Sequence, residues 1–171
     1  AAREPEFVDL CNFLNSLGAR ISGAGSETIE IDGVSRLWPA SRPYRILPDR
    51  IETGTYLCAA AVTGGDIRVT NTDPSLMTSV MEKLAETGCE ITAGNDWVRC
   101  NATGPLRGIS LTTEPHPGFP TDMQAQLMTL ACIAQGRSEL VETIFENRFM
   151  HGAELMRMGA TIQLDGNQAT I

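Results

Sequence analysis

An internal repeat constrains the fold of this chain more than any other feature of its sequence. The pattern Leu-x-x-x-Gly-(Ala/Cys)-x-Ile occurs three times, with glycines at positions 18, 88 and 159, so the copies are 70 and 71 residues apart. In each copy the glycine follows a helical apolar pattern and precedes a short β-rich stretch. Glycine commonly ends a helix because it takes the left-handed conformation at little cost. A period this regular predicts a chain built from similar structural units.

Each unit is predicted to contain a helix, a strand, a second helix and two further strands. In the middle of the chain, helical apolar spacing covers residues 50–63 and 76–87, with a strand at 67–70 between them and a hairpin at 90–100 after them. The other predicted elements are a helix at 3–17, a hairpin at 20–31, a strand at 110–113, a helix from 121 to 136, a strand at 140–145, a helix that ends at 158 and a hairpin at 161–171. Strands on either side of a helix need a crossover connection, so the class is predicted to be α/β with mixed sheets.

The segment from 32 to 48 is predicted to cross between two domains. Gly33, Pro39, Pro43 and Pro48 make it the part of the chain richest in residues that break helices and strands. The chain begins inside one unit and stops on the last strand of another, and a repeat protein seldom ends without a capping element. We therefore expect these 171 residues to be a fragment of a longer protein.

The net charge of −8 argues against several classes of partner. Nucleic acid and anionic membranes attract basic surfaces, so neither is predicted as a partner, whereas a few local arginines suffice for a small anionic ligand. The five cysteines include no C-x-x-C pair and the two histidines lie far from metal-ligand spacing, so no disulfide framework, metal or cofactor is predicted. The sequence has no bilayer-spanning apolar run and no secretory signal, which predicts a cytoplasmic protein.

Asp122 is the first candidate for chemistry. It falls in the first turn of a predicted helix, where the helix dipole favours a negative charge, and in a sheltered cleft it could accept a proton from a substrate hydroxyl. The alternative is a carboxylate that only stabilises the helix. Asp49 stands in the equivalent place of the preceding unit, and the same two interpretations apply to it.

Further candidates surround the predicted junction between the strand at 140–145 and the next helix. Arg148 could hold a carboxylate or phosphate with two hydrogen bonds, or pair with a nearby Glu on the surface. Ile144 and Phe145 could form the wall of a pocket for a flat ring or a sugar, or pack in the core. Glu4 and Glu6 begin the first helix and are most simply solvated partners of its dipole. These residues predict a cleft for an anionic ligand, and no particular reaction.

Three segments carry a family resemblance that goes further. They are L-P-D-R-I-E-T-G-T at 47–55, H-P-G-F-P-T-D-M-Q-A-Q at 116–126 and E-T-I-F-E-N-R-F-M-H at 142–151. With A-A-R-E-P-E at the N-terminus, they resemble the UDP-N-acetylglucosamine 1-carboxyvinyltransferases, which are enolpyruvyl transferases. The resemblance implies two domains, each an inside-out α/β barrel of three β-α-β-α-β-β units. It assigns residues 1–46 to the end of the first domain and the crossover, and residues 47–171 to about two repeats of an incomplete second domain.

The resemblance also implies a reaction and roles for several residues. Enolpyruvate would move from phosphoenolpyruvate to the 3-hydroxyl of UDP-N-acetylglucosamine through a tetrahedral intermediate, in the first committed step of peptidoglycan synthesis. Asp122 matches the aspartate that is the family's general base, and the backbone of Ile144 would hold the UDP-sugar. Thr121, Phe145 and Arg148 match pocket residues near it.

The chain lacks other parts that the family uses. These are a Lys-Asn pair, the loop with the reactive cysteine, and an arginine that grips phosphoenolpyruvate. We therefore expect the fragment to be inactive alone and to need the missing portions of its own chain as partners. Two alternatives stay open: a 3-phosphoshikimate 1-carboxyvinyltransferase, which has the same repeats, and a non-catalytic module that binds a UDP-sugar.

Overall fold

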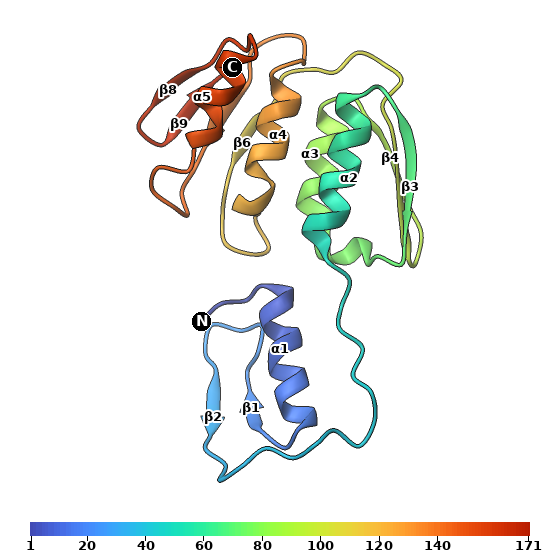
Figure 1. The fold of residues 1–171 in the computed structure, drawn as a ribbon, viewed down its shortest axis with the longest axis vertical. Helices are drawn as coiled ribbons and strands as arrows, with labels where there is room; N and C mark the ends of the chain where they lie inside the picture. The colour runs from blue at the N-terminus through green and yellow to red at the C-terminus, as the bar shows by residue number, and fades with distance from the viewer. The chain divides into compact units, whose positions relative to one another are not determined.

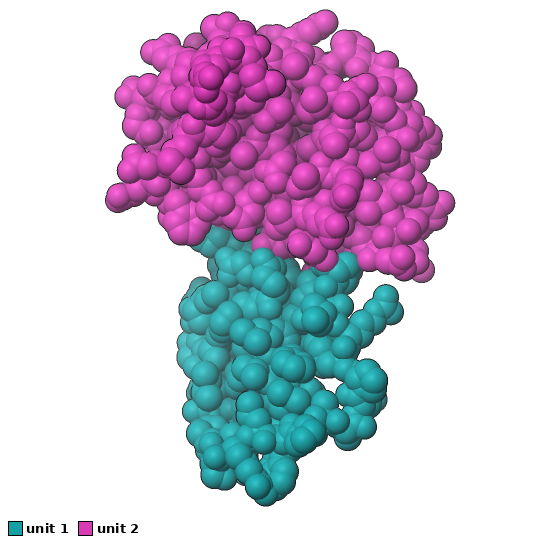
Figure 2. Space-filling view, viewed as in Figure 1, with its two compact units in different colours: residues 1–48, 115–117 teal, residues 49–114, 118–171 magenta.

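The computed structural model describes all of residues 1–171, and the chain divides into two compact units. The first unit contains residues 1–48 and 115–117, and the second contains residues 49–114 and 118–171 (Figure 2). No helix of either unit is both long and apolar enough to cross a membrane.

The first unit contains the predicted helix and hairpin. Helix α1 spans Pro5–Ser16, and strands β1 (Arg20–Ser22) and β2 (Glu30–Asp32) pair antiparallel. The side chain of Asn15 accepts a hydrogen bond from the backbone N–H of Ile21 and donates one to its carbonyl oxygen, both at 2.8 Å. These two bonds tie the last turn of α1 to β1.

The second unit begins with one repeat of the predicted order. Its elements are α2 (Arg50–Val62), β3 (Asp66–Thr70), the 3-10 turn η1 (Pro74–Met77), α3 (Thr78–Glu86), β4 (Glu90–Ala93) and β5 (Trp97–Asn101). The three strands form a sheet in the order β3-β5-β4, and both pairings are antiparallel.

A second repeat completes this unit and has one strand more. Its elements are β6 (Ser110–Thr112), the 3-10 turn η2 (Thr121–Met123), α4 (Gln124–Ala131), β7 (Glu139–Val141), α5 (Met150–Arg157), β8 (Gln163–Asp165) and β9 (Gln168–Thr170). The strand order is β6-β7-β9-β8, with β6 parallel to β7 and the other pairs antiparallel. The parallel pair is joined by a crossover through α4, so the prediction of mixed sheets is confirmed.

The two sheets share one strand arrangement. β3-β5-β4 corresponds to β7-β9-β8, and β6 has no counterpart beside β3. Neither sheet closes on itself, as expected for an incomplete barrel.

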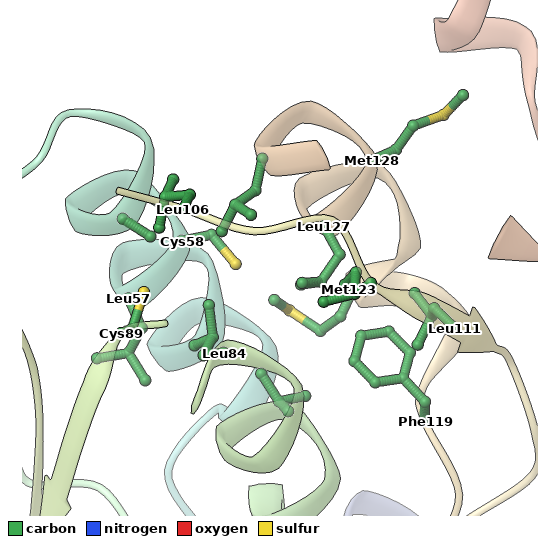
Figure 3. Close-up of a cluster of buried hydrophobic side chains, with 14 of the residues drawn as sticks. Leu57, Cys58, Leu84, Cys89, Leu106, Leu111, Phe119, Met123, Leu127 and Met128 are labelled. Carbon is green, nitrogen blue, oxygen red and sulfur yellow. The ribbon is translucent and has the colours of Figure 1, made fainter. Parts of the chain in front are cut away.

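Helices from both repeats pack in a shared core. α2 contacts both α3 and α4, and the three helices lie side by side in Figure 1. Leu57, Leu84, Met123 and Leu127 meet there with no exposed surface (Figure 3). Gly54 in α2 allows the closest approach, because a Cβ at this position would lie 2.8 Å from Cε and 2.9 Å from Sδ of Met123. The position of η2 therefore depends on α2 of the other repeat.

The predicted strand at 140–145 is wrong in its second half. β7 ends at Val141, and the chain then forms turns up to Phe149. The cause is the Glu142 carboxylate, which accepts hydrogen bonds from the backbone N–H groups of Ile144 and Phe145 and so bends the segment. The predicted helix from 121 to 136 also differs, because its first turn is the 3-10 turn η2 and α4 ends at Ala131.

Candidate functional site

The site residues gather where strands β6 and β7 end. Because these strands are parallel, their carboxyl ends lie at the same edge of the sheet. Thr113 follows β6, and Glu142 begins the segment after β7. We call residues 142–149 the β7–α5 loop. It lies beside η2, the turn that carries Thr121 and Asp122, because side chains of both segments bond to each other.

Glu142 is at the centre of this arrangement and is 2% exposed. Its carboxylate accepts hydrogen bonds from Thr113 Oγ1 at 2.9 Å, Thr121 Oγ1 at 2.8 Å, Ile144 N at 2.9 Å and Phe145 N at 3.2 Å, with Gln124 Nε2 at 3.5 Å. All of these donors are neutral. Burial alone would raise the pKa of the Glu142 carboxyl, but the hydrogen bonds, led by that from Ile144, outweigh it and lower the pKa below its usual range. The group is therefore a buried carboxylate anion at neutral pH.

Backbone contacts fasten the β7–α5 loop on its other side. Glu142 N donates to the carbonyl oxygen of Asn167 at 2.8 Å, and Asn167 Nδ2 donates to the carbonyl oxygen of Glu142 at 3.0 Å. Asn167 belongs to the turn between β8 and β9. Thr143 N donates to Thr113 Oγ1 at 2.9 Å, which adds a further link to the end of β6. The start of the loop is thus held from three elements.

Asp122 and Arg148 form an ion pair at the surface of the site. Arg148 Nη2 donates to Asp122 Oδ1 at 2.6 Å, and the two side chains are 36% and 56% exposed. The Arg148 guanidinium carbon lies 4.9 Å from the centroid of the Phe145 ring, and that ring is also exposed. An exposed ion pair contributes at most about 1 kcal/mol to stability. Both side chains therefore remain accessible to a ligand without much cost to the fold.

A small cavity of about 240 Å³ lies against the loop. Phe145, Arg148 and Phe149 line it from the loop, and Gly166 and Asn167 line it from the β8–β9 turn. Ligand pockets that enclose a drug-sized molecule measure roughly 300–1,000 Å³. This cavity can hold only part of a molecule as large as a nucleotide sugar.

His151 follows the loop in α5. Burial and the positive charge of Arg148 lower the pKa of its imidazole, so the ring is neutral at pH 7. Its Nε2 atom is buried and has no hydrogen-bond partner. No group of His, Cys, Asp or Glu side chains is arranged to hold a metal ion.

Comparison with known proteins decides the family. The sequence model described as EPSP synthase (3-phosphoshikimate 1-carboxyvinyltransferase) matches residues 1–171. The chain belongs to this family. The enolpyruvyl transferase NikO from Streptomyces tendae is 28% identical, with a TM-score of 0.80 over 98% of this chain and 40% of that one. The predicted enolpyruvyl transferase fold is therefore confirmed.

Two more distant structures share the fold of this EPSP synthase family member. One structure of EPSP synthase from Acinetobacter baumannii is 20% identical, with a TM-score of 0.61 over 92% of this chain and 38% of that chain. A second is 18% identical, with a TM-score of 0.52 over 96% of this chain and 38% of that chain. The chain thus spans about two fifths of the length of the solved structures it matches.

Five of the site residues predicted from the sequence lie close together in the structure. Asp122 and Arg148 pair directly, Phe145 lies under Arg148, and Thr121 and Ile144 both donate to Glu142. Their roles in binding and catalysis stay predictions.

Of the three other candidates, one caps a helix and two belong to the first unit. Asp49 is the N-cap of α2 and accepts hydrogen bonds from Ile51 N at 2.8 Å and Glu52 N at 3.1 Å. Glu4 and Glu6 lie in the first unit, at the start of α1. The structure therefore gives Asp49 a clear role in holding its helix, and a role for any of the three in a site stays a prediction.

Sequence reasoning missed Glu142 and Thr113. Glu142 stands within one of the segments that carry the family resemblance, but a Glu at the end of a strand is most often a solvated residue. Nothing in the local sequence shows that hydroxyls from residues 21 and 29 positions away converge on it. The available signal was an acid two and three residues before Ile144 and Phe145, whose amides it could bind.

Proposed function

We propose that the protein containing this chain transfers enolpyruvate from phosphoenolpyruvate to the 3-hydroxyl of UDP-N-acetylglucosamine. Family membership supports an enolpyruvyl transferase. The choice of UDP-N-acetylglucosamine as acceptor rests on the sequences of the three segments, at 47–55, 116–126 and 142–151, that resemble the UDP-N-acetylglucosamine 1-carboxyvinyltransferases. The observation that carries the proposal is the ion pair of Asp122 with Arg148, 2.6 Å long and accessible, beside the exposed ring of Phe145. It combines a proton acceptor, an anion-binding group and a flat apolar surface.

Asp122 would act as general base on the acceptor. Its carboxylate takes the proton of the sugar hydroxyl as the oxygen attacks the carbon of phosphoenolpyruvate that bears the phosphate. A general acid outside this chain would protonate the methylene carbon, which gives a tetrahedral intermediate. The C–O bond to phosphate then breaks, and a base takes a proton from the new methyl group, which restores the double bond. Arg148 donates to Oδ1 of Asp122, which would leave Oδ2 to accept the proton of the sugar hydroxyl.

The chain supplies only part of the binding surface under this proposal. The cavity of about 240 Å³ is too small for a nucleotide sugar, and no lysine or arginine other than Arg148 lines it. Phosphoenolpyruvate carries up to three negative charges and needs several cationic partners. We therefore expect the isolated chain to release no phosphate, and residues 1–46 and 47–171 to be pieces of two domains.

The acceptor can be tested directly with the full-length protein. Phosphate release from phosphoenolpyruvate is measured with UDP-N-acetylglucosamine and, separately, with shikimate 3-phosphate, and calorimetry gives the affinity for each. We expect turnover and binding with the UDP-sugar only. Turnover with shikimate 3-phosphate alone would contradict the proposal and favour the second candidate, 3-phosphoshikimate 1-carboxyvinyltransferase, whose activity names the matching family.

A non-catalytic module gives a different result in the same experiment. It binds the UDP-sugar, but the full-length protein releases no phosphate with either acceptor. The Asp122→Asn variant gives the reference for a protein that binds without turnover. It keeps the size of the side chain and removes its ability to take a proton at neutral pH.

A further inference from the structure

Glu142 is not required by the fold at its position. Leu140 pairs with Ala169 across β7 and β9, and Val69 pairs with Val98 across β3 and β5, so the two repeats can be superposed by their strands. Glu142 follows Leu140 by two residues, and Asn71 follows Val69 by two residues, so the two occupy equivalent positions. Asn71 is exposed, whereas Glu142 is buried. The first repeat therefore connects its strand to its helix, through the 3-10 turn η1, without a buried charge at the position of Glu142.

The polar contact at the same place in the first repeat is much simpler. Thr53 of α2 and Thr72 share one buried hydrogen bond of 2.9 Å between their hydroxyls. In the second repeat, an anion with at least four neutral donors occupies this region. A buried carboxylate is costly to desolvate, and a hydroxyl pair is not. The buried carboxylate, which is the more costly of the two arrangements, occurs in the repeat that carries Asp122 and Arg148. This placement points to a role of Glu142 beyond folding.

The two oxygens of Glu142 serve two different segments. Oε1 accepts from Ile144 N and Phe145 N, and so shapes the β7–α5 loop that carries Arg148. Oε2 accepts from the hydroxyl of Thr121, the residue before Asp122 in η2. One rigid carboxylate thus spans the two segments that supply the ion pair. The exposed ion pair itself is too weak to set this distance.

We propose that Glu142 is a positioning residue, whose carboxylate holds η2 against the β7–α5 loop so that Asp122, Phe145 and Arg148 meet the acceptor substrate in one geometry. Protein donors occupy both oxygens of its carboxylate, so it acts through the residues that it holds and not on the reacting atoms. The proposal rests on the proposed function only in taking the acceptor to bind at Asp122. It holds for any acceptor that presents a hydroxyl to Asp122.

Replacement by glutamine separates this role from simple packing. Gln has nearly the shape of Glu but carries no charge, and its NH2 group cannot accept hydrogen bonds. If the NH2 faces the loop, the bonds from Ile144 N and Phe145 N are lost; if it faces Thr121, it can only donate to that hydroxyl, and a weaker neutral bond replaces the charge-assisted one. Either way, the link to one of the two segments is weakened. Glu139→Gln is the matched control, because Glu139 lies in β7, the strand that leads into Glu142, and forms an exposed ion pair with Arg137.

The experiment uses the full-length protein and three readouts. Steady-state kinetics give kcat and the KM of each substrate, calorimetry gives the Kd of UDP-N-acetylglucosamine, and hydrogen exchange reports on the β7–α5 loop. For Glu142→Gln we expect the Kd and KM of the acceptor to rise about 10-fold and kcat to fall roughly 10- to 100-fold, since small misplacements of reacting groups are costly. We expect the KM of phosphoenolpyruvate to change less than about 2-fold, loop amides to exchange faster, and α4 amides to be unchanged. Glu139→Gln should match the wild type in all three.

Two results would overturn the proposal. One is an unchanged acceptor Kd and unchanged loop exchange in Glu142→Gln. The other is a rise in KM for both substrates with faster exchange throughout the second unit, which indicates a merely structural role. If the wild-type protein acts on neither acceptor, the proposed function fails, while exchange in the loop still decides whether Glu142 holds it.

Discussion

Gly54 offers a quantitative test of how closely the two repeats pack beneath Asp122. In Gly54→Ala, the new Cβ would lie 2.8 Å from Cε of Met123, which is about 0.7 Å closer than carbon atoms approach at their optimum. These atoms are the end of a flexible side chain, but Met123 is fully buried, so they can move only within the packed core. Overpacking of this kind costs roughly 1–3 kcal/mol, and the better helix propensity of alanine returns about 1 kcal/mol. We expect a net loss of about 0–2 kcal/mol.

Gly152→Ala in α5 is the matched control. Its Cβ would meet Met128 Cε at 3.4 Å, an ordinary contact, so we expect stability to be unchanged or to rise by up to about 1 kcal/mol. Urea unfolding followed by circular dichroism measures both variants. Both variants gain helix propensity, so Gly54→Ala should be less stable than Gly152→Ala by the overpacking cost of roughly 1–3 kcal/mol, and equal stability refutes the reasoning. Because Met123 follows Asp122 directly, Gly54→Ala should also weaken acceptor binding, and Gly152→Ala should not.

Three further predictions concern the site and the core. Asp122→Asn should lower phosphate release roughly 100- to 10,000-fold and shift the unfolding free energy by less than about 1 kcal/mol; near wild-type turnover would exclude Asp122 as the base. The lowered pKa of Glu142 means that its contribution to stability is complete above the ordinary carboxyl pKa and is lost as pH falls through the lower folded value. Urea unfolding between neutral pH and acid should therefore show a steeper loss in the wild type than in Glu142→Gln, and equal slopes would contradict this. Leu140→Ala removes a fully buried side chain of β7 and should cost about 2–5 kcal/mol in the same assay, so a loss below about 1 kcal/mol would show that the core relaxes around it.

The repeat was predictable because backbone geometry at three glycines is a local property. Gly18, Gly88 and Gly159 all end helices with positive φ, at 95°, 100° and 102°. Other residues are strained in this conformation, so the sequence records it directly. The order of helices and strands between the glycines follows from apolar periodicity, and most element boundaries agree within two or three residues.

The site was less predictable because its contacts are long-range. Asp49 and Asp122 follow similar Pro-containing sequences, yet Asp49 is the N-cap of α2, while Asp122 lies two positions after the N-cap of η2 and pairs with Arg148. The inserted Thr121 makes the difference, and its hydroxyl is bound by Glu142. Likewise, Ile144 and Phe145 have the composition of a strand, but a buried carboxylate bends their backbone. Local propensity carries no information about such a partner.

The missing counterpart of β6 also bears on how this protein behaves in solution. The outer edge of β3 presents backbone N–H and C=O groups that no strand pairs, and such an edge is a template for association with another chain. The net charge of −8 keeps molecules apart at low ionic strength, but salt shortens the reach of this repulsion to about 10 Å at 0.1 M. Backbone pairing acts at contact distance and is not screened in the same way. Colloidal stability of the chain should therefore decrease as salt is added, and purification at low ionic strength favours the monodisperse form.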